Sequence, residues 1–283
     1  MAFPDEAATE LTRCINELGF VGALVDGFLV NGTFYDGPEY EGFWSTLESL
    51  QVPIYIHPTF PNNSQVSQTA SSSSSDSLVL TSPPQLHAPG GRNTPVSADF
   101  SLFYAANMGT TSWDFHANVG LHFMRLYSAG VFERHPGLKL ILGHMGEMVP
   151  FMLERSDYFL SPLNTSMKSL KQVYADNVWI TTAGFYWTST LATVLRNTKV
   201  ERIMYSVDYP FGGNNEGAAF LQELRSSGMV NEQEFQAIAH GNAEALLKLP
   251  VPTSTTQMAP TTAGPTQWPR PTGPIQSANW GWW

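Results

Sequence analysis

An apolar run that begins at Lys139 constrains the fold of this chain most, because it stops abruptly in Gly-His-Met-Gly-Glu at residues 143–147. Such a run is typical of a strand buried on both faces, as in a parallel sheet covered by helices. The two glycines allow a tight turn and a close approach to a ligand. His144 and Glu147 then lie where the strand ends, which is where α/β barrels build active sites. The alternative is an ordinary surface turn, since short apolar runs are ambiguous.

Two further predicted strands deliver a titratable group in the same way, one ending at His57 and the other at Asp208. Helical segments separate the strands, and this alternation predicts a parallel sheet with right-handed crossovers. We therefore expect both groups to join His144 and Glu147 at one edge of the sheet. Imidazoles and carboxylates suit Zn²⁺ or a similar divalent ion, and those that do not bind the metal can serve as general acid or base.

The fold class predicted from this pattern is α/β, of the TIM-barrel-like (β/α)8 family, with about five parallel strands and flanking helices. The strands are expected near Val21, Val52, Leu138, Val178 and Ile203. A closed barrel has eight strands. Five strands would leave two free edges and inward apolar faces with nothing opposite them.

Composition predicts the domain organisation. Residues 1–249 form the partial barrel, which is interrupted by a flexible Ser/Pro-rich insertion at about 62–99. Residues 250–283 are rich in Pro, Thr and Trp and predict a disordered tail. His116 and His122 are expected to be satisfied histidines of a predicted helix, and His135 is expected to be exposed in a turn.

Charge and cysteine content exclude several function classes. The net charge of −10 argues against a nucleic-acid partner, because phosphates need a basic face. The single cysteine, Cys14, fits a reducing compartment. The start of the chain has no signal-peptide pattern and no window is apolar enough to span a membrane. We therefore expect a cytoplasmic protein without a membrane partner.

Taken together, these motifs resemble the amidohydrolase-related decarboxylases, a family that includes γ-resorcylate, 2,3-dihydroxybenzoate and aminocarboxymuconate-semialdehyde decarboxylases. The resemblance covers about residues 4–61 and 112–248. It implies a metal-dependent, non-oxidative decarboxylase of a small aromatic acid such as a hydroxybenzoate, on a TIM-barrel-like fold. It also implies one divalent ion, Zn²⁺ or Mn²⁺, and a homo-dimer or tetramer. The segments that carry it are 55–58, 120–136, 141–147, 205–210 and 241–243.

The resemblance also implies roles for the strand-end residues. His57 and Asp208 would bind the metal, and Asp208 would pass a proton to the ring carbon that loses CO₂. His144 and Glu147 would orient the substrate and relay protons.

Arg155 and Tyr209 are further candidates for substrate binding by the same resemblance. Trp113, Phe115, Tyr209 and Phe211 are aromatic and could wall the pocket, although core packing is the alternative for each of them.

One departure from the family's pattern is clear. In the family the first strand carries a Glu-x-His or His-x-His pair that completes the metal site, and no such pair stands near this N-terminus. The hypothesis that follows is a truncated or incompletely predicted version of a decarboxylase, which lacks the first three strands and is poorly folded or inactive as written. The alternatives are that a partner copy or the tail completes the barrel, that the scaffold hydrolyses a substrate with His144 activating a metal-bound water, or that the chain is a non-catalytic remnant.

Overall fold

The computed structural model describes residues 1–60 and 107–249 of the chain. The predicted insertion at about 62–99 and the predicted tail at 250–283 lie outside the described residues.

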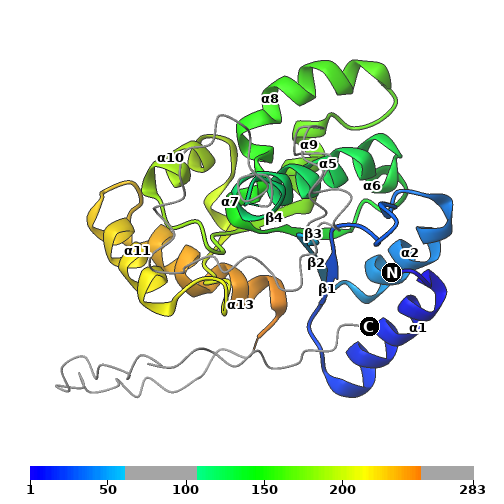
Figure 1. Cartoon of the computed structure of the whole chain (residues 1–283), viewed down its shortest axis with the longest axis horizontal. Coiled ribbons are helices and arrows are strands. Elements are labelled where there is room, and N and C mark those ends of the chain that lie inside the picture. Colours follow the sequence, from blue (N-terminus) through cyan, green and yellow to red (C-terminus); the bar gives the residue numbers. More distant parts are fainter. Residues whose placement is uncertain (61–106, 250–283) are drawn as a thin grey trace, which may run out of the picture. The chain divides into compact units, whose positions relative to one another are not determined.

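A five-stranded parallel sheet forms the centre of the described chain, in the order β1-β2-β3-β4-β5 (Figure 1). The predicted α/β class and the five strands are confirmed. Each strand is joined to the next by a segment that contains a helix, as a parallel pair requires. The strands are β1 (Ala23–Asp26), β2 (Pro53–His57), β3 (Lys139–Leu142), β4 (Val178–Thr181) and β5 (Ile203–Met204).

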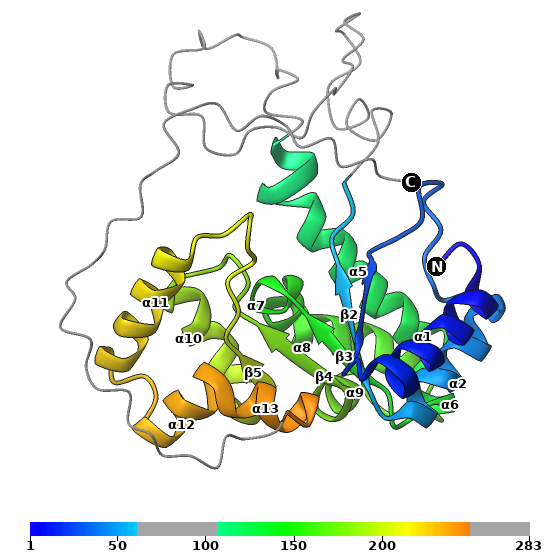
Figure 2. The ribbon, with the colours of Figure 1, turned by 90° about the horizontal axis from the view of Figure 1, so that it is seen from below.

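Helices flank this sheet on both sides and at both edges. In Figure 1, α5, α8 and α9 lie on one side of the sheet and α13 lies on the other. Figure 1 places α1 and α2 beyond β1, and Figure 2 places α10 and α11 beyond β5. The main helices are α1 (Pro4–Leu18), α2 (Glu41–Leu50), α5 (Asp114–Ser128), α6 (Val131–Arg134), α8 (Val149–Leu160), α9 (Leu170–Asn177), α10 (Thr188–Asn197), α11 (Asn214–Ser226), α12 (Glu232–Gln236) and α13 (Asn242–Leu247).

The two faces of the sheet are both packed, because successive side chains of a strand point to opposite faces. Leu140 and Leu142 of β3 belong to the main core with the helices on that side. Ile141 points the other way and forms a smaller cluster with Met204 of β5 and Leu246 of α13. The expectation of inward apolar faces with nothing opposite them is therefore wrong at this position, where α13 covers the sheet.

The register of the parallel strands brings their carboxyl ends to one edge. Asp26 pairs with His57, and Ile56 pairs with Leu142. The residues that follow Leu142, and those that follow β5, therefore emerge at the same edge of the sheet as His57. Among the described residues, no helix is both long and apolar enough to cross a bilayer.

Candidate active site

The turn after β3 has an unusual backbone. His144, Met145, Gly146, Glu147 and Met148 all have positive φ, between 47° and 86°. Only glycine adopts this region without steric cost, and other residues lose roughly 1–2 kcal/mol each. A run of such residues persists only where the surrounding structure enforces it, and such strain gathers at functional sites.

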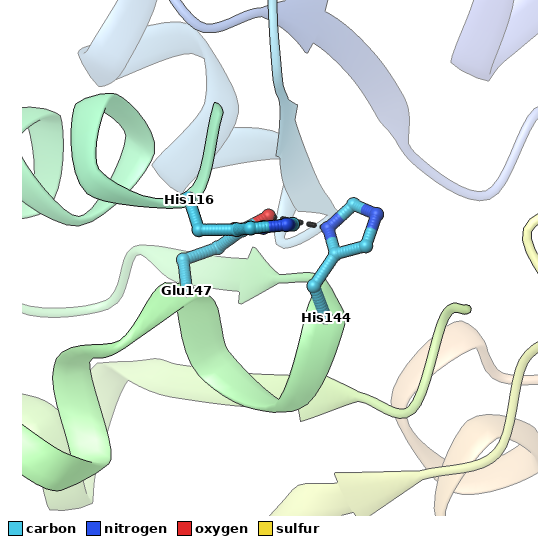
Figure 3. A group of neighbouring side chains, drawn as sticks. All are labelled: His116, His144 and Glu147. Atoms are coloured by element: carbon cyan, nitrogen blue, oxygen red, sulfur yellow. Dashed lines mark hydrogen bonds and ion pairs between the residues drawn. The ribbon is translucent and has the colours of Figure 1, made fainter. Parts of the chain in front are cut away.

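This turn forms the short element α7 (His144–Glu147). The side chains of His144 and Glu147 lie next to that of His116 from helix α5 (Figure 3). The carboxylate of Glu147 lies between two imidazoles, as Figure 3 shows. Its Oε1 accepts from His144 Nδ1 at 2.6 Å, and its Oε2 accepts from His116 Nδ1 at 2.7 Å. His116 stands in the first turn of α5, and its Nε2 donates to the carbonyl of Thr111 at 3.0 Å. Glu147 is fully buried, and such a carboxylate is tolerated only when it is paired in this way.

The other ring nitrogen of His144 faces Asp208. Nε2 of His144 lies 3.4 Å from Oδ2 of Asp208. Burial lowers the pKa of His144, but the nearby carboxylates of Glu147 and Asp208 outweigh it and raise the pKa to about 9. Burial acts to raise the pKa of Asp208, but the ion pair with His144 and the proximity of His57 lower it to about 2. Near neutral pH the pair is therefore an imidazolium facing a carboxylate.

His57, at the end of β2, is oriented by its own backbone. Its Nδ1 donates to the carbonyl of Pro58 at 2.8 Å, which leaves Nε2 to face the cavity. That Nε2 lies 4.0 Å from Oδ1 of Asp208, which is too long for a hydrogen bond. Two ligands about 2.0–2.2 Å from a shared tetrahedral ion are about 3.3–3.6 Å apart, so a small movement of either side chain would let this pair share an ion. A backbone carbonyl on the far nitrogen is also the usual partner of a metal-binding imidazole.

A second group of donors lies nearby, because one atom each of His116, His144 and Glu147 lies within 4.8 Å of the others. The Nδ1 atoms of both rings are already hydrogen-bonded to the carboxylate, and His116 Nε2 is bonded to Thr111. A metal ion there would have to replace these bonds. His57 and Asp208 therefore fit a divalent cation better, because their facing atoms have no such partner among the described residues.

A cavity of about 510 Å³ opens over this edge of the sheet. Its polar floor includes His57, His144 and Asp208, and its walls are mostly apolar. The aromatic residues that line it are Phe60, Phe115, Phe185, Tyr186, Tyr209 and Phe211.

The sequence-predicted site residues fall into two groups. The structure brings His57, Asp208 and His144 together at this cavity, with Tyr209 and Phe211 on its wall. Arg155 is an exception, since it is exposed on α8, stacks its guanidinium on Phe159 at 5.0 Å, and does not line the cavity. Its position along α8 turns it away from the sheet edge, so the structure does not support a contact with substrate within one chain.

The family model for amidohydrolases matches residues 1–249. The chain belongs to the amidohydrolase family. It is 41% identical to the decarboxylase orsB of Emericella nidulans over 88% of this chain and 68% of that protein. It is 33% identical to the γ-resorcylate decarboxylase of Rhodococcus jostii, over 87% of this chain and 68% of that one. These relatives place the chain among the carboxy-lyases of the amidohydrolase family.

Solved structures of the same family match the described fold. A dihydroxybenzoic acid decarboxylase from Polaromonas sp. JS666, with bound manganese and 2-nitroresorcinol, is 29% identical and superposes with a TM-score of 0.68. The match covers 87% of this chain and 66% of that one. This amidohydrolase chain thus spans about two thirds of the length of the relatives that it matches.

The sequence predicts His116 and His122 to be satisfied helix histidines and His135 to be exposed in a turn, and the structure differs on His135. His116 is buried on α5 with both ring nitrogens hydrogen-bonded, one of them to Glu147, which the sequence did not indicate. His135 is also buried, between the carboxylates of Glu41 and Glu48, at 2.8 and 3.2 Å. His122 is buried on α5, as a structural histidine that accepts from the backbone N–H of Tyr35. Only the tertiary crossing of α5 over the turn after β3 reveals the role of His116.

Proposed function

We propose that this amidohydrolase is a metal-dependent, non-oxidative decarboxylase of a small aromatic acid such as a hydroxybenzoate. The observation that carries the proposal is the meeting of His57, Asp208 and His144 on one cavity with aromatic walls. Apolar walls with a few convergent polar groups are typical of sites that bind a ring with polar substituents.

In this proposal His57 and Asp208 hold the divalent ion, Mn²⁺ or Zn²⁺. When bound, the ion supplies positive charge that polarises an oxygen of the substrate. The donor set fits this role, because Nε2 of His57 faces Asp208 and Asp208 is held in its ionised form. A manganese ion in the Polaromonas relative supports the choice of metal.

The remaining residues manage the proton. In decarboxylation the bond between the ring carbon and the carboxylate breaks, CO₂ leaves, and the electron pair stays on the ring carbon until a proton arrives. His144 holds a proton on Nε2, and Asp208 Oδ2 lies 3.4 Å away. We assign His144 as the proton source for Asp208, which delivers the proton to the ring carbon, and Glu147 as the group that orients His144 through Nδ1.

The aromatic wall would place the substrate ring. Tyr209 and Phe211 follow directly after Asp208, and Phe60 approaches Phe115 edge-on, with ring centroids 5.0 Å apart. Such surfaces exclude water and strengthen the charged interactions on the cavity floor.

No observation on the described residues supports the hypothesis of an inactive chain. The predicted homo-dimer or tetramer stays a prediction for gel filtration with light scattering.

The test is product analysis with the full 283-residue chain. The chain is loaded with Mn²⁺ and incubated with 2,6-dihydroxybenzoate. We expect equal amounts of resorcinol and CO₂, and no product from Asp208→Asn. The control is an aryl ester, which a hydrolase of this scaffold would cleave. Ester cleavage without release of CO₂, or metal-loaded protein that leaves a panel of hydroxybenzoates unchanged, would contradict the proposal.

A further inference from the structure

We propose that His116 is a positioning residue, which holds Glu147 so that His144 presents its Nε2 to Asp208. This inference deepens the proposed function and rests on it for the catalytic consequence. The geometric part does not depend on turnover.

The buried polar chain is continuous from the backbone to the reacting edge of the cavity. It runs from the Thr111 carbonyl to His116 at 3.0 Å, to Glu147 at 2.7 Å, to His144 at 2.6 Å, and to Asp208 at 3.4 Å. Every acceptor in the first part of this chain is an oxygen without a proton. Both ring nitrogens of His116 have an oxygen partner, so the ring is fixed at both ends.

Glu147 is held by a clamp, which is the pair of hydrogen bonds from His116 and His144 to its carboxylate. Its carboxylate has no exposure to solvent, and each of its two oxygens has one imidazole donor. Without His116, Oε2 would be a buried acceptor without a hydrogen-bond partner, which is unfavourable even though Oε1 keeps its bond to His144. The carboxylate would then turn toward any other donor, and His144 would lose the partner that fixes its Nδ1.

Ring packing prevents a simple rearrangement. The rings of His116 and His144 lie 4.8 Å apart, and Phe185 packs edge-on against both, at 4.9 and 6.0 Å. A side chain on α5 thus acts on the turn after β3, and through it on the cavity.

Two substitutions separate this role from simple anchoring. Asn places its amide nitrogen where His carries Nδ1, and Gln places its amide nitrogen where His carries Nε2. His116→Asn can still donate to Glu147 but cannot reach the Thr111 carbonyl. His116→Gln can still reach Thr111 but leaves Glu147 without its donor. If His116 only ties the start of α5 to Thr111, His116→Gln should stay closer to the wild type than His116→Asn in both readouts below.

The first readout is NMR of ¹⁵N-histidine-labelled protein at fixed pH. We expect the Nδ1 protons of His116 and His144 to be strongly downfield in the wild type, because both lie in short charge-assisted bonds. The His144 signal should persist in His116→Asn and shift upfield or vanish in His116→Gln. A wild type without these two signals, or a His144 signal unchanged in His116→Gln, would overturn the proposal. If a variant does not fold, the wild-type measurement still tests the two hydrogen bonds on which the proposal rests.

The second readout is turnover. Loss of a residue that hydrogen-bonds to a group of the site, without touching the metal or the substrate itself, typically costs about 10- to 100-fold in activity. We expect kcat to fall by about that factor in His116→Gln with little change in KM, and to be largely kept in His116→Asn. Equal kcat in the two variants would contradict the positioning role. NMR signals that behave as expected in a wild type without turnover would instead refute the proposed function and leave the geometric inference intact.

Discussion

Replacement of Glu147 by Gln should destabilise the metal-free protein and remove much of its pH dependence. The carboxylate accepts two charge-assisted hydrogen bonds, at 2.6 and 2.7 Å, and it is fully buried. Each such bond contributes about 1.5–3 kcal/mol, and Gln keeps one acceptor oxygen that can still serve one imidazole. We expect the free energy of unfolding to fall by about 2–4 kcal/mol.

The pH dependence follows from His144. Burial lowers its pKa, but Glu147 and Asp208 raise it from 6.5 to about 9. A group whose pKa is raised by folding stabilises the protein below the unfolded pKa, and this contribution is lost as pH rises through the folded pKa. At about 1.4 kcal/mol per pKa unit, the wild type should lose about 3 kcal/mol between pH 6.5 and pH 9 from this group alone. Glu147→Gln should lose clearly less, because only Asp208 then favours the imidazolium.

The assay is urea unfolding with EDTA present, followed by far-UV circular dichroism at both pH values. Equal m-values show that midpoints can be compared. Glu154→Gln is the matched control, since Glu154 is exposed and its ion-pair partner within the described part of the chain is Lys171, at 3.2 Å. Its midpoint should not move. A Glu147→Gln variant as stable as the wild type at pH 6.5, or with the same loss toward pH 9, would refute the clamp between the two imidazoles.

Three further substitutions test the scaffold by the same unfolding assay. Gly120→Ala places a methyl group 2.6 Å from the Glu147 carbonyl oxygen. It should lower the free energy of unfolding by about 1–3 kcal/mol, although Ala is the better helix former. A gain in stability would contradict the close approach of α5 to the turn after β3. Leu142→Ala removes a fully buried side chain of β3 and should cost about 2–5 kcal/mol, whereas a cost below that of a surface change would place β3 outside the core. Asn177→Ala removes the amide that donates to two carbonyls just before β3, at 2.9 and 2.8 Å, and should cost about 1–3 kcal/mol; an unchanged midpoint would mean that water replaces it.

The sequence predicts the strand-end residues well because two simple rules apply to them. An apolar run identifies each strand, and the helical connections require the strands to be parallel. His57, His144 and Asp208 therefore fall on one edge whatever the details of packing, and the structure brings them to one cavity.

Other features depend on tertiary geometry that periodicity does not contain. The partner of His116 lies 31 residues along the chain, and the contact exists only because α5 crosses the turn after β3. The left-handed backbone of this turn includes Met145 and Met148, which carry no local signal for it. Arg155 was a candidate by resemblance, but the phase of α8 around its axis decides that it faces solvent. The cover that Leu246 provides on the second sheet face depends on how α13 returns to β5.

The metal content of the purified chain tests the central claim most directly, measured by mass spectrometry after gel filtration in the presence of Mn²⁺. The account predicts about one ion per chain in the wild type and in His116→Asn, and little in His57→Ala, because His57 and Asp208 hold the ion. Metal retained in His57→Ala but lost in His116→Asn would move the ion to His116, His144 and Glu147. That result would contradict both the assigned metal site and the clamp.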